Sequence, residues 1–101
     1  MNPVEQARQD RKERLRWRCL KTVYYGGEGL GCSDEIILQV VSTEGFNCCR
    51  QELRGELGYL EKAKLISITR TATRWTCTTT LEGAMVCEGN KDCPPGIRPE
   101  E

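Results

Sequence analysis

The stretch NCCRQELRGELGYLEKAKLI, residues 47–66, decides the fold, because it combines an amphipathic helix with a strand that follows directly. On a helical wheel of about 100° per residue, its apolar side chains form one stripe. That stripe consists of Phe46, Cys49, Leu53, Leu57 and Leu60. Asn47 suits the N-cap, since its side-chain oxygen can accept a hydrogen bond from a first-turn amide. We therefore expect a helix over residues 47–62 with Cys49 facing the core and Cys48 facing away.

A two-stranded hairpin is expected after this helix, where the apolar period changes from 3.6 to 2. Residues 65–70 and 74–80 alternate and are rich in Ile, Thr and Trp, which is typical of strands. Thr71-Ala72-Thr73 is short enough to join them. Thr80 can then cap a last short helix whose candidate packing residues are Leu81, Met85 and Val86, although Gly83 inside that helix is unfavourable.

Two helices are expected before residue 47. The later one follows Ser33 as its N-cap, buries Ile36, Ile37, Val40 and Val41, and ends at Gly45 in a left-handed conformation. The earlier one follows Asn2 as N-cap and extends to Tyr25. Its second half docks through Leu15, Cys19 and Val23, whereas its first half is polar on all sides.

The connection between these two helices is the glycine-rich segment GGEGLG, residues 26–31, where Leu30 could belong to a very short strand. A phosphate-binding loop is the weaker alternative, because no Gly-Lys-Ser/Thr follows. At the other end of the chain, residues 88–101 contain three Pro, two Gly and few apolar groups. We expect this tail to be flexible.

The composition indicates one domain of 101 residues without a strong electrostatic signature. Lys+Arg and Asp+Glu both number 15, so the formal net charge is zero, which argues against a simple basic nucleic-acid binder. The charge is uneven, however, since residues 1–24 carry +4 and residues 25–45 carry −4. We expect no signal peptide, no membrane span and a cytoplasmic location in which the seven cysteines stay reduced.

The order helix, short strand, helix, turn, helix, strand, hairpin turn, strand resembles a winged helix-turn-helix domain. Leu57-x-x-Leu60-x-x-Ala63-x-Leu65-Ile66 resembles the passage from recognition helix to wing in ArsR and MarR regulators, although Lys64 stands where Gly is usual. Thr80-Leu81-Glu82-Gly83 resembles the L-T-x-x-G that follows the wing there. The chain also resembles small ArsR-like winged-helix proteins of Mu-like phages and prophages. The resemblance covers residues 12–87.

This resemblance implies an α+β fold with a three-helix core, a two-stranded wing and a short C-terminal helix. It implies a winged-helix domain over residues 1–87 and a flexible tail over residues 88–101. The helix-turn-helix would cover residues 34–62 and the wing residues 65–80. A homodimer through the first helix would supply a second DNA half-site.

Double-stranded DNA is the partner that the resemblance implies, with residues 47–62 in the major groove and residues 70–74 on the backbone. Asn and Gln can read adenine, Arg can read guanine, and wing residues can hold phosphates. The candidate DNA-binding residues are Asn47, Arg50, Gln51, Arg54, Arg70, Thr71, Thr73 and Arg74. Three acidic residues on the same helix, Glu52, Glu56 and Glu61, would repel phosphate.

A protein-interaction or assembly module, for example in phage morphogenesis, is the main alternative. Gly55 and Gly58 in mid-helix cost about 1 kcal/mol each relative to Ala, so they need a reason. That reason is either close approach by a partner or close packing within the chain itself.

A thiolate metal or redox site is the third alternative, because Cys48-Cys49 open the expected helix of residues 47–62, whose dipole could lower a thiol pKa. The chain has no C-x-x-C and no His, and its cysteine spacings match no zinc module, so we expect no metal and no cofactor. Cys93 in the tail is expected to be the most exposed thiol. The lack of His also leaves no recognisable catalytic constellation, and we expect no enzyme activity.

Overall fold

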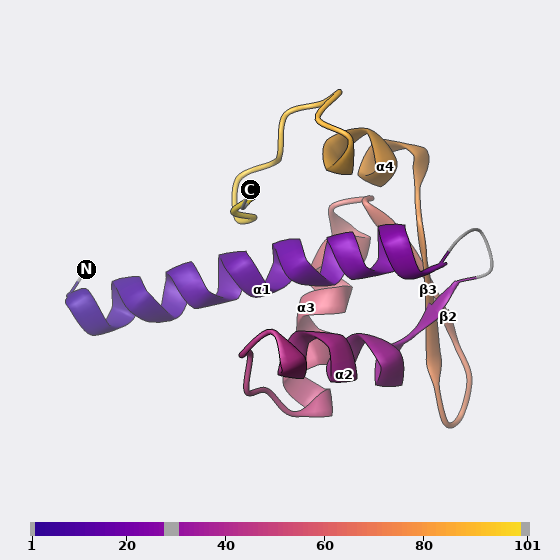
Figure 1. Ribbon diagram of the computed structural model, residues 1–101, viewed down its shortest axis with the longest axis horizontal. Helices are drawn as coiled ribbons and strands as arrows, with labels where there is room; N and C mark the ends of the chain where they lie inside the picture. Colours follow the sequence, from indigo (N-terminus) through magenta and orange to yellow (C-terminus); the bar gives the residue numbers. More distant parts are fainter. Residues whose placement is uncertain (1, 28–30, 100–101) are drawn as a thin grey trace.

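The computed structural model describes residues 2–27 and 31–99 and shows an α+β fold (Figure 1). Within these residues there are four helices and one sheet of three antiparallel strands. The elements in chain order are α1 Pro3–Gly27, β1 Cys32–Ser33, α2 Asp34–Thr43, α3 Arg50–Lys62, β2 Ile66–Arg70, β3 Trp75–Thr79 and α4 Leu81–Cys87. The expected elements are thereby confirmed, apart from Leu30, which lies outside the described residues.

The sheet has the strand order β1-β3-β2, so the last strand in the chain is the central one. Cys77 of β3 lies opposite Cys32 of β1 on one side and opposite Ile68 of β2 on the other. It is fully buried, because the sheet packs against the C-terminal part of α1. The first half of α1 extends beyond the rest of the molecule (Figure 1).

Local capping chemistry fixes the ends of α2 as the sequence predicts. Ser33 Oγ accepts a hydrogen bond from the Ile36 amide at 3.2 Å. At the other end, Gly45 has φ +95°, its amide donates to Ser42 O, and the Phe46 amide donates to Val41 O at 3.0 Å. This is the Schellman arrangement, which ends the helix and directs the chain into α3.

The start of α3 differs from the prediction, because the helix begins at Arg50 and its N-cap is Cys49 rather than Asn47. Cys49 Sγ accepts a hydrogen bond from the Glu52 amide at 3.5 Å. Because the helix does not extend back to residue 47, the helical wheel does not apply to Cys48 and Cys49. Their predicted orientations, with Cys49 inward and Cys48 outward, are therefore reversed. Cys48 packs against the core, and Cys49 is exposed.

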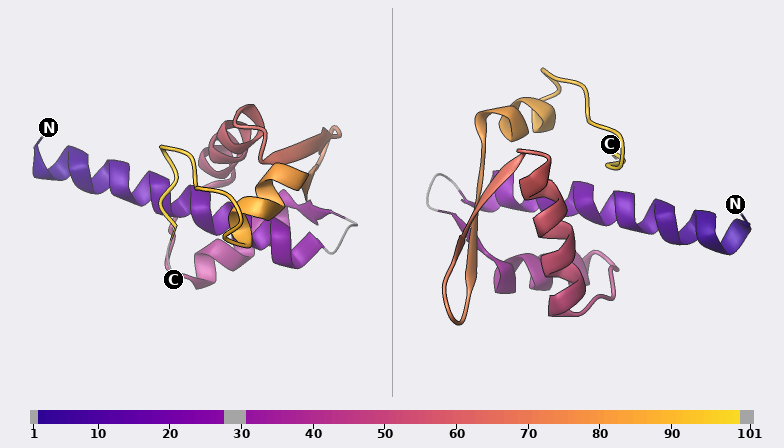
Figure 2. Two further views of the ribbon diagram at one scale, coloured as in Figure 1. Left: turned by 90° about the horizontal axis from the view of Figure 1, so that it is seen from above. Right: turned by 180° about the vertical axis from the view of Figure 1, so that it is seen from behind.

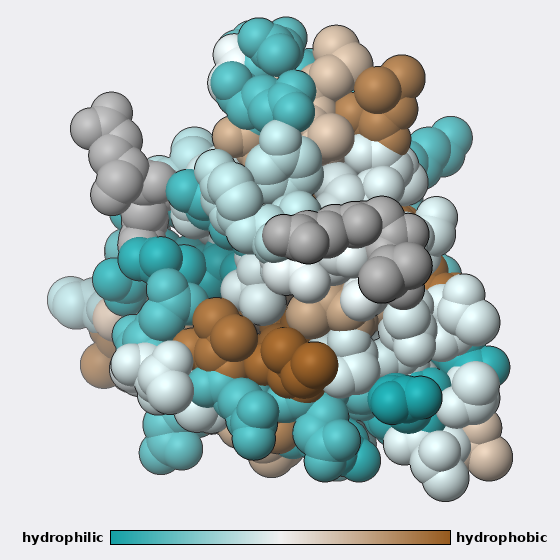
Figure 3. Space-filling view, turned by 45° about the vertical axis from the view of Figure 1, so that its right-hand side comes forward, coloured by the Kyte–Doolittle hydropathy of each residue, from teal (hydrophilic) through white to brown (hydrophobic). Residues whose placement is uncertain are grey.

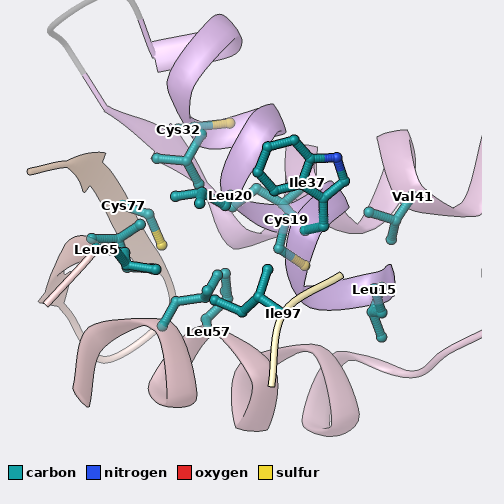
Figure 4. Packing of buried hydrophobic residues seen from close by; sticks show 14 of the residues in the cluster. Leu15, Cys19, Leu20, Cys32, Ile37, Val41, Leu57, Leu65, Cys77 and Ile97 are labelled. Carbon is teal, nitrogen blue, oxygen red and sulfur yellow. The ribbon is translucent and has the colours of Figure 1, made fainter. Parts of the chain in front are cut away.

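The core lies where α1, α2, α3 and the sheet converge (Figure 4). Its fully buried leucines and isoleucine are Leu15, Leu20, Ile37, Leu53, Leu57 and Leu60, and all of them except Leu20 belong to the predicted stripes. Two predictions are wrong, since Ile36 is 52% and Leu81 is 79% exposed. Val86 packs inward from α4 in place of Leu81, because the helix presents only one face to the core.

The described part of the C-terminal tail packs on α1 and α3, contrary to the expectation of a flexible segment. Ile97 is only 5% exposed and belongs to the core cluster. The Arg98 amide donates to Glu13 O at 3.2 Å, and the Tyr59 hydroxyl donates to Pro95 O at 3.2 Å. Figure 2 shows this segment, in yellow, returning towards α1. One apolar side chain and several hydrogen bonds thus hold a segment of low hydrophobicity.

Membrane-spanning helices are not found among the described residues, since none of the helices there combines the length and the apolar character that crossing a bilayer requires.

Candidate functional site

The predicted site residues lie on the exposed side of α3 and on the β2–β3 hairpin, which we call the α3–hairpin face. It comprises Asn47, Arg50, Gln51 and Arg54, together with residues 70–74. The start of α3 and the turn of the hairpin point towards the same side of the molecule (Figure 2, right). The structure therefore brings the two predicted segments to the same side of the molecule. The individual residues differ in their solvent exposure and in their ion pairs.

Arg54 is held by a carboxylate that the chain buries. Its Nε lies 2.8 Å from Asp34 Oδ2, and its guanidinium carbon lies 4.9 Å from the centre of the Trp75 ring. Burial opposes the ionisation of Asp34, but hydrogen bonds from Arg54 and from the Trp75 amide outweigh it and lower the pKa of the carboxyl group. Arg54 thus connects α2, α3 and β3 rather than standing free on the face.

Arg70 is also engaged, through two hydrogen bonds to Glu61 of 2.8 and 3.0 Å. These bonds lower the pKa of the Glu61 carboxyl and raise the pKa of the Arg70 guanidinium. The Arg70 guanidinium carbon lies 4.5 Å from the centre of the Trp75 ring, so both arginines contact the same indole. Two of the four predicted cations are therefore neutralised within the chain.

The other predicted residues are more accessible. Asn47 and Gln51 are exposed, and Arg50 makes only a 3.7 Å ion pair with Glu35 in which both side chains are largely exposed. At the hairpin turn, Thr71 Oγ1 donates to Arg74 O at 2.9 Å and accepts from the Arg74 amide at 3.1 Å. Thr71 therefore shapes the turn.

Thr73 and Arg74 remain exposed at this turn, and the Arg74 side chain has no acidic partner among the residues that the structure describes. Sequence reasoning did not select Lys62, in the last turn of α3, or Lys64, two residues after the helix. Both are exposed, and neither forms an ion pair in the described ranges. For Lys62, its position in the last turn, where cations complement the helix dipole, was the available signal.

The two mid-helix glycines of α3 have no packing role within the described chain. A Cβ atom built on Gly55 or on Gly58 would meet no heavy atom within 4 Å. Of the two alternatives for these glycines, close packing against another element of the same chain is therefore excluded within the described residues. Between Gln51 and Lys62, the outer face of α3 is a strip of bare backbone.

The cysteines do not form a metal site in the described residues, where no group of three or more His, Cys, Asp and Glu side chains could hold an ion. All seven thiols are free. Burial raises the pKa of Cys48, contrary to the lowered value expected for this position, and it raises the pKa of Cys77 to about 12. Cys93 is partly buried and contacts Ile97 O, so Cys49 is the exposed thiol instead.

Comparison with protein-family models and with curated proteins gives no match. Among solved structures, the chain is similar to "Crystal structure of AF1382 from Archaeoglobus fulgidus", with a TM-score of 0.59 and 16% sequence identity. The match covers 73% of this chain and 77% of that chain. The likeness shows a shared fold and says nothing about function.

Proposed function

We propose that this protein is a small winged-helix DNA-binding protein, a phage, prophage or bacterial transcriptional regulator of the cytoplasm. In this proposal α3 enters the major groove, and the turn of the β2–β3 hairpin contacts the backbone. The observation that carries the proposal is the common orientation of these two segments (Figure 2, right). Exposed hydrogen-bonding side chains are present on both.

The accessible residues supply the direct contacts in this proposal. Gln51 and Asn47 can donate to and accept from adenine, and Arg50 can bind guanine once it exchanges its long ion pair with Glu35. Thr73 and Arg74 at the hairpin turn can bind phosphates. Arg54 and Arg70 hold α3 and the hairpin in place through Asp34 and Glu61, and their role in binding is to position the face.

The test is fluorescence anisotropy of a labelled generic duplex with the reduced protein, at about 50 mM and about 200 mM salt. We expect affinity to fall steeply with salt, because counterions leave the phosphates on binding. Arg74→Ala should lower the salt slope by about 1. Arg8→Ala removes one exposed charge from the far end of α1 and is the matched control, which should leave the slope unchanged. A duplex that stays unbound at micromolar protein in low salt would refute the proposal.

A protein-interaction or assembly module without DNA binding is the second candidate. The bare backbone at Gly55 and Gly58 favours it, because a partner helix could approach α3 closely there. The neutralisation of Arg54 and Arg70 also favours it, since less free charge remains for phosphates. Replacing both glycines by Ala should weaken the binding of such a partner helix, whereas DNA binding through Arg74 would persist.

A further inference from the structure

The outward side of α3 carries polar side chains only at its two ends. Gln51, Gly55, Gly58 and Lys62 follow one another at intervals of four, three and four positions, so they lie on one line along the helix. We call this line the α3 strip. Gln51 and Lys62 are exposed, and a Cβ atom at either glycine would meet no heavy atom within 4 Å. A ligand that lies along the strip therefore meets side chains at the start and the end of α3 and bare backbone between them.

The three carboxylates of α3 offer little opposition to an anion on this strip, because each of them is paired with an arginine. Glu52 Oε2 lies 2.8 Å from Arg11 Nη1, and Glu56 Oε1 lies 3.0 Å from Arg16 Nε. Glu61 is bound from the hairpin side by two hydrogen bonds. On a helical wheel all three point about 90° or more away from the strip. The repulsion of phosphate that these residues suggest in the sequence is thus offset within the chain.

Lys62 supplies the charge on the strip. It is the last residue of α3, and it forms no ion pair within residues 2–27 and 31–99. Its neighbour Glu61 is already bound to Arg70, so that carboxylate does not neutralise it. A lysine ammonium on its long flexible side chain binds phosphate as a point charge. Lys62 is therefore suited to hold a phosphate at the end of the α3 strip.

The length of the strip places its two ends on different parts of a duplex. Gln51 and Lys62 are eleven positions apart, which is about 16 Å of helix at the usual rise per residue. The major groove is about 12 Å wide, and a recognition helix contacts base edges with its N-terminal residues. When Gln51 lies against the bases, Lys62 therefore lies near the edge of the groove, where the phosphates are.

Base contacts are restricted to the start of α3 by the two glycines, since glycine offers no side chain to a base edge. The side chains available there belong to Arg50 and Gln51 in the first turn and to Asn47 shortly before it. The side chain of Gln51 has no hydrogen-bond partner in the part of the chain that the structure describes. One helical turn rises about 5.4 Å, which corresponds to about two base pairs at about 3.4 Å each. With Asn47 included, about three adjacent base pairs can be read.

Arg74 contacts a different phosphate from Lys62, because the two residues lie at opposite ends of β2. Lys62 precedes that strand, and Arg74 follows the turn at its far end. The five residues of β2 span about 16 Å, whereas successive phosphates of one DNA strand are about 3.4 Å apart along the axis. In Figure 3 the lower edge of the molecule, at the level of the hairpin turn, is mostly teal and white and hence hydrophilic to intermediate. The two cations therefore count separately in the salt dependence of binding.

We propose that Lys62 anchors α3 to a phosphate and that base recognition is confined to about three adjacent base pairs at the start of the helix. In this assignment Arg50 and Gln51 determine the sequence preference, whereas Lys62 raises the affinity for all sequences alike. The assignment rests on the proposed DNA binding by the α3–hairpin face, and it specifies which residues give affinity and which give preference. The base pairs beside the bare middle of α3 are interchangeable.

The experiment uses the full chain and a labelled duplex library with about ten random base pairs, since the whole of α3 covers only about six. Sequencing of the bound fraction gives the base preferences, and fluorescence anisotropy at about 50 mM and about 200 mM salt gives the salt slope. We expect preferences at about three adjacent positions, of which Gln51→Ala abolishes at least one without changing the slope. Lys62→Ala should leave the preferences unchanged and lower the slope by about 1, so that affinity falls about 3.5-fold less between the two salt concentrations.

Lys62→Arg is the matched control for Lys62→Ala, because it keeps the charge and should keep the slope. Arg8→Ala removes an exposed charge from the far end of α1 and should change neither the preferences nor the slope. Circular dichroism checks that each variant remains folded.

Three outcomes would overturn the inference. A chain that binds no duplex would refute the proposed function and the inference together. A chain that binds duplex DNA with the same slope in Lys62→Ala as in the unchanged protein would remove the anchor and leave the proposed function standing. Preferences that extend over about six or more adjacent positions, or that survive Gln51→Ala unchanged, would show that other residues of α3 read the bases.

Discussion

Asp34 and Arg54 form an ion pair, with 2.8 Å between Oδ2 and Nε, that joins the start of α2 to the middle of α3. The Asp34 side chain is 1% exposed and that of Arg54 is 29% exposed, so the carboxylate is buried while the guanidinium reaches solvent. The second carboxylate oxygen accepts a hydrogen bond from the Trp75 amide at 3.3 Å. One carboxylate therefore fixes the position of α3 and of the hairpin relative to α2.

Arg54→Ala should lower the free energy of unfolding by about 2–3 kcal/mol, because it leaves a buried carboxylate without its charged partner. Urea unfolding at neutral pH measures this loss. Arg50→Ala is the matched control, since its pair with Glu35 is 3.7 Å long and exposed, and it should change stability by less than about 0.5 kcal/mol. Equal losses in the two variants would contradict a special role for Arg54. A DNA-binding defect in Arg54→Ala must accordingly be corrected for misfolded protein.

The Asp34–Arg54 ion pair should also make the free energy of unfolding depend on pH in the acidic range. Because the pKa of Asp34 is lowered in the folded protein, its contribution is fully present above the ordinary value of 3.8 and is lost as the pH falls below it. Glu61 has a lowered pKa as well and adds to the same trend. Urea unfolding of the wild type and of Asp34→Asn, measured from neutral to acidic pH, separates the contribution of Asp34 from that of Glu61. The stability difference between them should shrink as the pH falls, and a difference that is constant with pH would refute this assignment.

The glycines of α3 and α4 should respond oppositely to Ala. Gly58→Ala should stabilise the protein by up to about 1 kcal/mol, because the added Cβ meets nothing and the helix gains propensity. Gly83→Ala should destabilise it, because the Cβ would lie 2.0 Å from the Leu65 carbonyl oxygen. Thermal unfolding of both variants provides the comparison. A loss of stability in Gly58→Ala would indicate that α3 packs against something within the chain after all.

The order and type of the elements were predictable because they depend on local chemistry. Ser33 and Thr80 cap their helices as expected, and Gly45 ends α2, since each acts on residues within three or four positions. The start of α3 was missed because a thiol, at Cys49, replaces the usual oxygen acceptor. The packing of Ile97 was missed because it depends on α1, more than 80 residues earlier.

The site was less predictable than the fold, because its charges are paired across the chain. Arg54 finds its carboxylate 20 residues away and Arg70 finds Glu61 nine residues away. A helical wheel places Arg54 near the outer side of α3, and the hairpin pattern places Arg70 next to the turn, but neither pattern can show these partners. Arg74 has none among the described residues, yet the sequence alone gave no reason to rank it above the other arginines.

The tail should contribute to stability through its one buried side chain. Ile97→Ala should lower the free energy of unfolding by about 2–3 kcal/mol, at the lower end for a buried Ile because the site lies at the edge of the core. Leu81→Ala removes a similar side chain that is 79% exposed, and it should cost less than about 0.5 kcal/mol. Urea unfolding of the two variants measures both losses. Equal effects would mean that the tail is not part of the cooperative unit.

Lys64 should be the residue whose replacement by glycine helps the fold. It has φ +66°, the only positive φ at a non-glycine position among the described residues, and it follows α3 where its amide donates to Glu61 O. A side chain in the left-handed region is strained by about 1 kcal/mol, and glycine removes that strain but is more flexible when unfolded. We expect Lys64→Gly to raise stability by about 0.5–1 kcal/mol. Lys64→Ala removes the same charge while keeping the Cβ, so it should give no gain. If both variants gained equally in urea unfolding, removal of the charge rather than relief of backbone strain would be the cause.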